Sequence, residues 1–177
     1  MPLDKIDLQI LKILQEDSRT PFTKIADDIS KTLGEKGLTH EGQKIPDTTI
    51  HFRVKKLKES GVIKRFSINI SPRILGFETI AIIKVNVGGH ILKKISLNRA
   101  ERISIQLSQS PNTVFIGIGQ DGVTIHALLI ARDRNELLNL VENLRKNPDI
   151  DSIEYNIFSD IKKGEEVLNP LPIGEEL

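Results

Sequence analysis

The apolar residues at the start of the chain recur every three or four positions. In the segment 3–14 they are Leu3, Ile6, Ile10, Ile13 and Leu14, which share one face of a helix. A second segment, 20–34, keeps this period, opens with Thr20 as a helix cap and Pro21 at the first helical position, and stops at Gly34. The pattern therefore predicts two amphipathic helices joined by a short break.

A third helix is predicted after a connection that has no period. This connection, EKGLTHEGQKIP (35–46), is rich in glycine and charge, and we expect it to lie on the surface, with room for a short extra strand or turn. Asp47 or Thr48 then caps a helix that stops at Gly61. Its apolar face is formed by Ile50, Val54 and Leu57. The next run, VIKRFSINIS (62–71), alternates as a strand does, and the whole predicts a winged helix-turn-helix.

The pattern changes at SPRILGFE (71–78), which we interpret as a linker. The predicted elements beyond it are strand TIAIIKVNV, helix NRAERISIQLSQS, strands NTVFIGIG and VTIHALLIA, helix DRNELLNLVENLRKN capped by Asp133, and strand IDSIEYNIF. The segment GGHILKKISL either lengthens the first of these helices or forms its own turn. A βαββαβ order is the ferredoxin-like arrangement. The predicted fold class is α+β: a winged helix-turn-helix (1–70), a ferredoxin-like domain (79–160) and an acidic tail (161–177).

One face of a ferredoxin-like sheet carries no helix. The strand segments AIIKV and HALLIA have apolar residues on both faces, and the helix-free face therefore needs another cover. A second copy of the same domain is the expected cover. The sequence thus predicts a homodimer, with a tetramer or octamer as larger alternatives.

Composition excludes several kinds of chemistry. The chain of 177 residues has no cysteine, which rules out disulfides, thiolate nucleophiles and Cys-ligated zinc. We expect neither a metal nor a cofactor. No apolar run is long enough to span a bilayer, and we expect a soluble, cytoplasmic protein without a membrane partner.

Charge is unevenly distributed, although the formal net charge is only +1. Residues 44–65 hold seven basic and two acidic residues, a net charge of +5, whereas the segment from Ser159 onward carries −3. We expect that acidic end to be disordered or loosely docked, with the alternative that it straps a partner subunit. The positive charge lies on and just after the third helix, where a tri-helical DNA-binding unit carries its recognition helix.

We predict that the outer face of the third helix and the residues after it contact double-stranded DNA. Short polar side chains near the helix start suit base edges, an exposed Phe suits a thymine methyl, and Lys and Arg suit phosphates. The predicted DNA-binding residues are Thr48, Thr49, His51, Phe52, Arg53, Lys55, Lys56, Lys64 and Arg65. The alternative is that this face of the helix is only solvated and that Phe52 packs under the 35–46 connection instead of contacting DNA.

These segments together resemble the Lrp/AsnC (feast/famine) family of prokaryotic transcription regulators. The resemblance covers nearly the whole chain and is most specific in TIHFRVKKLKESGVIKRF, with its Arg-Val, Lys-Leu and Gly-Val-Ile spacing. It implies a DNA-binding regulator whose C-terminal domain forms dimers, often assembles further, and senses a small molecule, commonly an amino acid. The connection between the second and third helices is longer than is usual in that family.

The resemblance also implies an effector site at a hairpin between the two middle strands. Family members typically have Gly-x-x-Asp there, whereas this chain has Gly119, Gln120, Asp121 and Gly122, with the acid one place early. These four residues are the predicted effector-binding positions. The other interpretation is structural, because Asp-Gly between two alternating strands is a strong signal for a tight hairpin turn. The two roles are compatible, since backbone N–H groups of such a turn can hold a carboxylate.

Two other classes of protein are alternatives to a regulator. Haem-pathway decarboxylases are similar in their two-domain layout, and His90 and His126 are the histidines of the second half of the chain. A lone His in a strand is more often a core or interface residue than a general acid, and the chain has no Ser-His-Asp triad motif and no phosphate-binding Gly loop. The remaining alternative is a ligand-sensing module that does not bind DNA.

Overall fold

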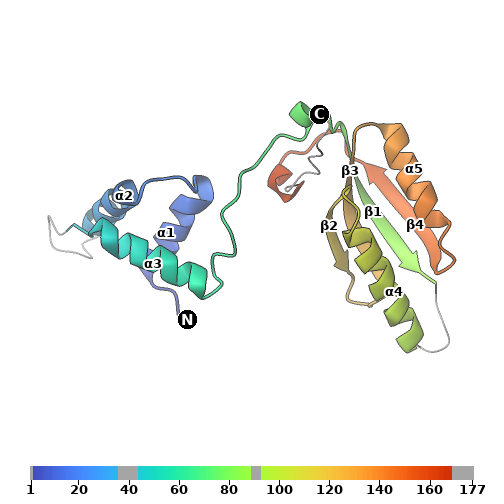
Figure 1. The fold of residues 1–177 in the computed structure, drawn as a ribbon, viewed down its shortest axis with the longest axis horizontal. Helices are drawn as coiled ribbons and strands as arrows, with labels where there is room; N and C mark the ends of the chain where they lie inside the picture. Colours follow the sequence, from blue (N-terminus) through green and yellow to red (C-terminus); the bar gives the residue numbers. More distant parts are fainter. Residues whose placement is uncertain (1, 36–43, 89–92, 169–177) are drawn as a thin grey trace. The chain divides into compact units, whose positions relative to one another are not determined.

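The computed structural model describes residues 2–35, 44–88 and 93–168. The chain divides into two compact units, Met1–Ile68 and Asn69–Leu177 (Figure 1). Within the described residues, no helix is both long and apolar enough to cross a membrane.

The N-terminal unit is built from three helices around one apolar core. They are α1 (Lys5–Glu16), α2 (Phe22–Glu35) and α3 (Asp47–Glu59). The core consists of Ile10, Leu14, Ile25, Ala26, Ile29, Leu33, Ile50, Val54 and Leu57. The third helix buries the three residues expected from its period, and Gly61 after it has the left-handed φ of 77° that favours glycine. Most of the predicted 35–46 connection lies outside the described residues.

The helix starts differ from the sequence predictions. The Thr20 hydroxyl donates to the Asp17 carbonyl at 2.9 Å, and α2 begins at Phe22, one residue after Pro21. The cap expected for α3 is wrong, because its N-cap is Pro46, which offers no side-chain hydrogen bond. Asp47 instead lies in the first turn, where its Oδ1 accepts the N–H of Thr48 at 2.8 Å and its charge suits the helix dipole.

The strand predicted over 62–71 is wrong, since this segment forms no regular strand. Its apolar side chains Val62, Phe66 and Ile68 are exposed. A strand needs a neighbour to accept and donate its backbone hydrogen bonds, and the described residues of the N-terminal unit form no other strand. Period-two alternation alone was therefore insufficient evidence for a wing strand here.

The C-terminal unit has the predicted βαββαβ order. Its strands are β1 (Thr79–Val87), β2 (Thr113–Ile118), β3 (Thr124–Ala131) and β4 (Ile150–Ile157), and its helices are α4 (Lys93–Ser108) and α5 (Arg134–Arg145). The sheet order is β2-β3-β1-β4, with antiparallel neighbours throughout (Figure 1). Asp133 caps α5 by accepting the N–H of Glu136, as expected. The ambiguous segment before α4 is helical from Lys93, and residues 89–92 lie outside the described residues.

The two faces of the sheet are covered differently. Helices α4 and α5 pack on one face, where alternate residues of β1 and β3 are buried: Ala81, Ile83, Val85, Val87, Ile125, Ala127, Leu129 and Ala131. On the other face, Ile80 and Ile130 are covered by Phe77 and by Leu168 of the short helix η2 (Glu165–Leu168). A 3-10 helix, η1 (Arg73–Leu75), lies in the predicted linker. The described part of the predicted tail is thus packed against the sheet through Leu168.

Candidate nucleic-acid interface and effector hairpin

The outer face of α3 presents the polar and cationic side chains that were predicted to contact DNA. Thr48, His51, Lys55 and Lys56 are exposed, and Thr49 is half-buried. Phe52 leaves 66% of its surface exposed, which is a large apolar group for solvent to surround. Burial of Ile50, Val54 and Leu57 on the inner side fixes this orientation of the helix.

His51 is held in place by a contact from α2. Its ring meets the Phe22 ring edge to face, with centroids 5.6 Å apart and planes at 69°. Because the His51 side chain stays exposed, the contact restricts its rotamer without removing its ring nitrogens from solvent. A polar group near the start of α3 is thereby oriented before any ligand arrives.

Arg53, also predicted to contact DNA, forms ion pairs within the N-terminal unit. Its Nη1 donates to Asp4 Oδ2 at 2.7 Å and to Asp7 Oδ1 at 2.8 Å, and its side chain is only 26% exposed. Asp4 and Asp7 also form the capping box of α1, since each side chain accepts the backbone N–H of the other residue. Arg53 therefore ties α3 to the start of α1, and we do not retain it among the DNA contacts.

Ionisation in this triad follows from its hydrogen bonds. Burial alone raises the pKa of Asp4, but the Asp7 N–H and the Arg53 guanidinium outweigh burial and hold that pKa below its usual value. Burial lowers the pKa of Arg53, but the hydrogen bonds to Asp4 and Asp7 outweigh burial and raise this pKa above its usual value. The ion pair is therefore charged at neutral pH. The D-x-x-D spacing of a capping box was the sequence signal for these two acids.

The remaining basic residues are largely free of intramolecular ion pairs. Lys55 approaches Glu59 at 3.9 Å, one turn further along α3, and both side chains are well exposed. Within the parts of the chain that the structure describes, Lys56, Lys64 and Arg65 form no salt bridge. Exposed cations without acidic partners are what phosphate binding requires.

The predicted effector positions form the hairpin between β2 and β3. Gly122 N–H donates to the Gly119 carbonyl at 2.9 Å, and Gly119 N–H donates to the Thr124 carbonyl at 2.7 Å. Asp121 Oδ1 accepts the N–H groups of Val123 and Thr124, and its Oδ2 accepts the Thr124 hydroxyl at 2.6 Å. These bonds, led by the Thr124 hydroxyl, lower the pKa of Asp121 to about 2. The Asp-Gly pair therefore builds the tight turn that its sequence indicates.

Geometry also explains why the acid is not at position 122. Gly122 has φ 78°, a conformation that side chains rarely adopt, and a Cβ there would lie 2.4 Å from Leu97 Cδ2 on α4. An aspartate at this position would be strained, and the end of the Leu97 side chain would have to move to admit it. The acid is placed one residue earlier, where it stabilises the turn. Effector binding by this hairpin stays a prediction.

His126, the described histidine of the C-terminal unit, lies in the sheet, where Asp121 is near enough to interact with it electrostatically. His126 lies on β3 opposite Lys84 of β1 and Gly117 of β2. The described parts of the chain contain no group of three His, Asp or Glu residues able to hold a metal ion. His90 lies outside the described residues.

Comparison with known proteins assigns the family. Residues 3–32 match the model of the AsnC-type helix-turn-helix domain, and residues 77–171 match that of the PF0864 C-terminal dimeric alpha+beta barrel domain. The uncharacterised HTH-type transcriptional regulator PH1013 of Pyrococcus horikoshii is 31% identical over 168 residues, which cover 94% of this chain and 93% of that protein.

Solved structures agree with this assignment. The transcriptional regulatory protein PF0864 of Pyrococcus furiosus, a member of the AsnC family, superposes with a TM-score of 0.76 at 28% identity and covers 94% of this chain and 96% of its own. The transcriptional regulator NMB0573 of Neisseria meningitidis, solved with L-Met, has a TM-score of 0.75 at 16% identity, with 92% and 94% coverage, which indicates a common fold. The chain belongs to the Lrp/AsnC family of helix-turn-helix transcriptional regulators.

Proposed function

We propose that this regulator acts in the cytoplasm and binds double-stranded DNA with α3 lying in the major groove. The observation that carries the proposal is the two-sided character of α3, apolar and buried on one side and exposed and cationic on the other. The family model of the helix-turn-helix ends at residue 32, before α3 begins. The assignment of the recognition helix therefore rests on the geometry of α3 itself.

The contacts divide by position along the helix. Thr48, Thr49 and His51, near the N-terminal end of α3, read base edges, as residues at the start of a recognition helix do. Phe52 beside them contacts a thymine methyl group. The cations further along, Lys55, Lys56, Lys64 and Arg65, bind phosphates and supply affinity without sequence preference.

The open face of the sheet supports a homodimer. Ile82, Leu128 and Phe115 lie side by side in register across β1, β3 and β2, with Ile82 39% and Phe115 48% exposed. A second copy would cover this apolar row, and the matched family model is described as dimeric. A two-fold axis would place two α3 helices in successive major grooves, roughly 34 Å apart, on a pseudo-palindromic site.

An amino acid is the effector class that we propose. NMB0573 was solved with L-Met, and the hairpin of this chain offers backbone N–H groups beside a fixed carboxylate. The N–H groups of Val123 and Thr124 are taken by Asp121, and the hairpin would therefore bind through the N–H groups of Gln120 and Asp121, for which the described residues provide no acceptor. Effector binding between C-terminal domains would change the assembly and hence the spacing of the DNA-binding units.

Fluorescence anisotropy tests the proposal. The purified protein is titrated onto a duplex from upstream of its own gene and onto a scrambled duplex, over a series of salt concentrations. Tighter binding to the upstream duplex, with log K falling by about 0.9 per phosphate contact for each unit of log salt, supports the proposal. Weak and equal binding to both duplexes would falsify it. Adding single amino acids to the same assay screens for the effector.

A further inference from the structure

Phe22 is the one aromatic residue among the described side chains that build the N-terminal core. The nine buried members of this core and the other partly buried residues packed against it are all aliphatic. Phe22 lies half-buried at the margin of the core, as the first residue of α2. An aliphatic side chain of similar volume would also fill such a margin, and the aromatic ring therefore calls for a second explanation.

The ring of Phe22 contacts the ring of His51 on α3. The two rings meet edge to face, with their centroids 5.6 Å apart and their planes at 69°. This geometry is attractive, because the positive edge of one ring lies against the negative face of the other. Such a pair favours one arrangement of the two side chains by about twofold to tenfold.

The position of Phe22 is itself fixed by the turn that precedes α2. Asp17 accepts three hydrogen bonds in this turn. Its Oδ1 accepts the N–H of Arg19 at 2.9 Å, and its carbonyl accepts the N–H and the hydroxyl of Thr20 at 3.1 Å and 2.9 Å. Packing against the core holds the other side of Phe22. The residue can therefore act as a rigid support for a side chain of α3.

His51 has no competing interaction in the part of the chain that the structure describes. Its side chain is exposed, and its ring takes part in no hydrogen bond or ion pair there. Both ring nitrogens are therefore available to a ligand, and in the neutral ring one of them donates and the other accepts a hydrogen bond. The helical backbone already disfavours one of the three χ1 rotamers, and the contact with Phe22 selects between the remaining two.

The rotamer of such a side chain matters for sequence readout. Each base pair presents its donors and acceptors at fixed points of the major groove, and a side chain must approach them from the right direction. An exposed side chain that samples several rotamers has to be ordered on binding, which lowers the affinity. A side chain that is already held in the required rotamer avoids this loss. The gain appears only on a sequence that the side chain reads.

We infer that Phe22 is a positioning residue for DNA sequence readout, whose ring holds the His51 imidazole ready for a base edge. This inference rests on the proposed function, since it requires α3 to lie in the major groove. In this role Phe22 acts through His51 and not by touching a base. Its effect is therefore expected on the preference for a sequence and not on the affinity for DNA in general.

The first measurement uses the free full-length protein. Three-bond NMR couplings of the His51 side chain report its χ1 populations, and the shifts of its ring protons report the neighbouring aromatic ring. One rotamer is expected to dominate in the parent protein and in Phe22→Tyr, which keeps the ring. In Phe22→Leu, which keeps an apolar side chain without a ring, the couplings are expected to average and the ring-proton shifts to move toward those of an exposed histidine.

The second measurement is competition anisotropy on the duplex from upstream of the gene and on a series in which its base pairs are replaced one at a time. Phe22→Leu is expected to reduce the preference for the parent duplex by about twofold to tenfold, at the same base pairs as His51→Ala does. Phe22→Tyr should retain the preference. Binding to the scrambled duplex and its salt slope should not change. In the His51→Ala background, Phe22→Leu is expected to have no further effect, whereas independent roles would add.

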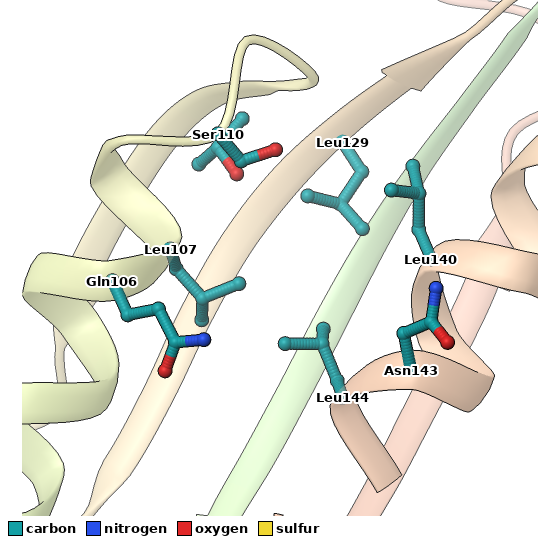
Figure 2. Close-up of a pocket in the computed structure, with 8 residues that line it drawn as sticks. Gln106, Leu107, Ser110, Leu129, Leu140, Asn143 and Leu144 are labelled. Atoms are coloured by element: carbon teal, nitrogen blue, oxygen red, sulfur yellow. The ribbon is translucent and has the colours of Figure 1, made fainter. Parts of the chain in front are cut away.

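Two matched controls separate positioning from a loss of packing. Ile13→Val trims another partly buried residue of the same core. Leu144→Val does the same in the C-terminal unit, where Leu144 of α5 borders the hollow between α4 and α5 (Figure 2). Both control variants are expected to bind every duplex of the series as the parent protein does.

Several results would overturn the inference. They are averaged His51 couplings in the parent protein, couplings that stay the same in Phe22→Leu, and a loss of preference at base pairs that His51→Ala does not affect. An equal loss in Ile13→Val would assign the effect to packing. A parent protein that does not distinguish the upstream duplex from the scrambled one would overturn the proposed function and this role of Phe22 with it. Discrimination that is retained in full by Phe22→Leu would overturn only the role of Phe22.

Discussion

Arg53 differs from the basic residues around it, because it is bonded within the N-terminal unit. It belongs to the most basic stretch of the chain, yet its guanidinium bonds to Asp4 and Asp7 within the N-terminal unit. Asp7 is the one charged residue that is buried in the described part of the chain, and it has two functions, as a capping acid of α1 and as an ion-pair partner. Such a residue contributes to stability, whereas its exposed basic neighbours are the residues that we propose to bind DNA.

We predict that Arg53→Met lowers the free energy of unfolding by about 2 kcal/mol, because it leaves the buried Asp7 carboxylate without its cation while keeping the apolar stem. Urea unfolding followed by circular dichroism measures the change. Glu59→Gln, which breaks the exposed pair with Lys55, is the matched control and should cost about 0.5 kcal/mol or less. An unchanged unfolding midpoint, together with a reduced salt dependence of DNA binding, would show that Arg53 contacts DNA and does not stabilise the fold.

We predict that the Asp121 carboxyl titrates with a midpoint of about 2. Its folded pKa is depressed below the ordinary value of about 3.9, and its contribution to stability is therefore complete above pH of about 4 and lost as the pH falls through about 2. The amide signals of Val123 and Thr124, which bond to this carboxylate, report the titration by NMR. Asp121→Asn should remove the transition. A midpoint near 4 would mean that the turn bonds are absent in solution.

At the scale of elements, different residues of α3 should determine the sequence specificity and the affinity of DNA binding. We predict that Lys56→Ala weakens binding to every duplex and reduces the slope of log K against log salt by about 0.9, as expected for the loss of one phosphate contact. Lys94→Ala, a comparable exposed lysine on α4 of the C-terminal unit, is the control and should leave the slope unchanged. Anisotropy titrations at several salt concentrations measure both.

We also predict that Thr49→Ala reduces the preference for the specific duplex, by a factor that corresponds to about 1–2 kcal/mol, while leaving the salt slope unchanged. Competition between specific and scrambled duplexes measures this preference. Equal losses on both duplexes for Thr49→Ala and Lys56→Ala would contradict the division of labour along α3.

The spacing of apolar residues correctly predicted the elements that have a buried face, but it did not predict the structure of exposed segments. The buried residues of α3 and the strands of the C-terminal unit follow their apolar spacing, because burial against a core selects one face. The alternation of apolar and polar residues at 62–71 does not reflect burial against a core. Val62 and Ile68 are exposed, and no strand pairs with them in the described residues. The cap of α5 was predicted correctly at Asp133, whereas the cap of α3 was not, because Asp47 could serve equally as cap or as first-turn acid.

The candidate sites were predictable only where residues lie close together in the sequence. The exposed face of α3 and the Asp-Gly turn follow from local spacing. The link from Arg53 to Asp4 joins residues 49 positions apart. Contacts of this kind depend on tertiary packing, for which a single sequence gives no spacing rule.

At the scale of the whole molecule, the row of Ile82, Leu128 and Phe115 should govern assembly. We predict that Ile82→Glu dissociates the homodimer, because a carboxylate in an apolar interface lacks a partner. Sedimentation velocity measures the change. Ile105→Glu is the matched control, since Ile105 is also exposed but lies on α4 on the other side of the sheet, and this variant should remain dimeric. Dissociation by both variants, or by neither, would exclude the open sheet face as the interface.

The small cluster of Phe77, Ile80, Ile130 and Leu168 has a practical consequence for anyone who shortens this protein. Residues 161–168 look dispensable in the sequence, yet Leu168 is almost completely buried against the sheet. Removing them would expose the apolar side chains of Phe77, Ile80 and Ile130 beside the apolar row of Ile82, Leu128 and Phe115. Exposed apolar surfaces of this size promote aggregation. A version that ends at Asp160 is therefore expected to precipitate during purification.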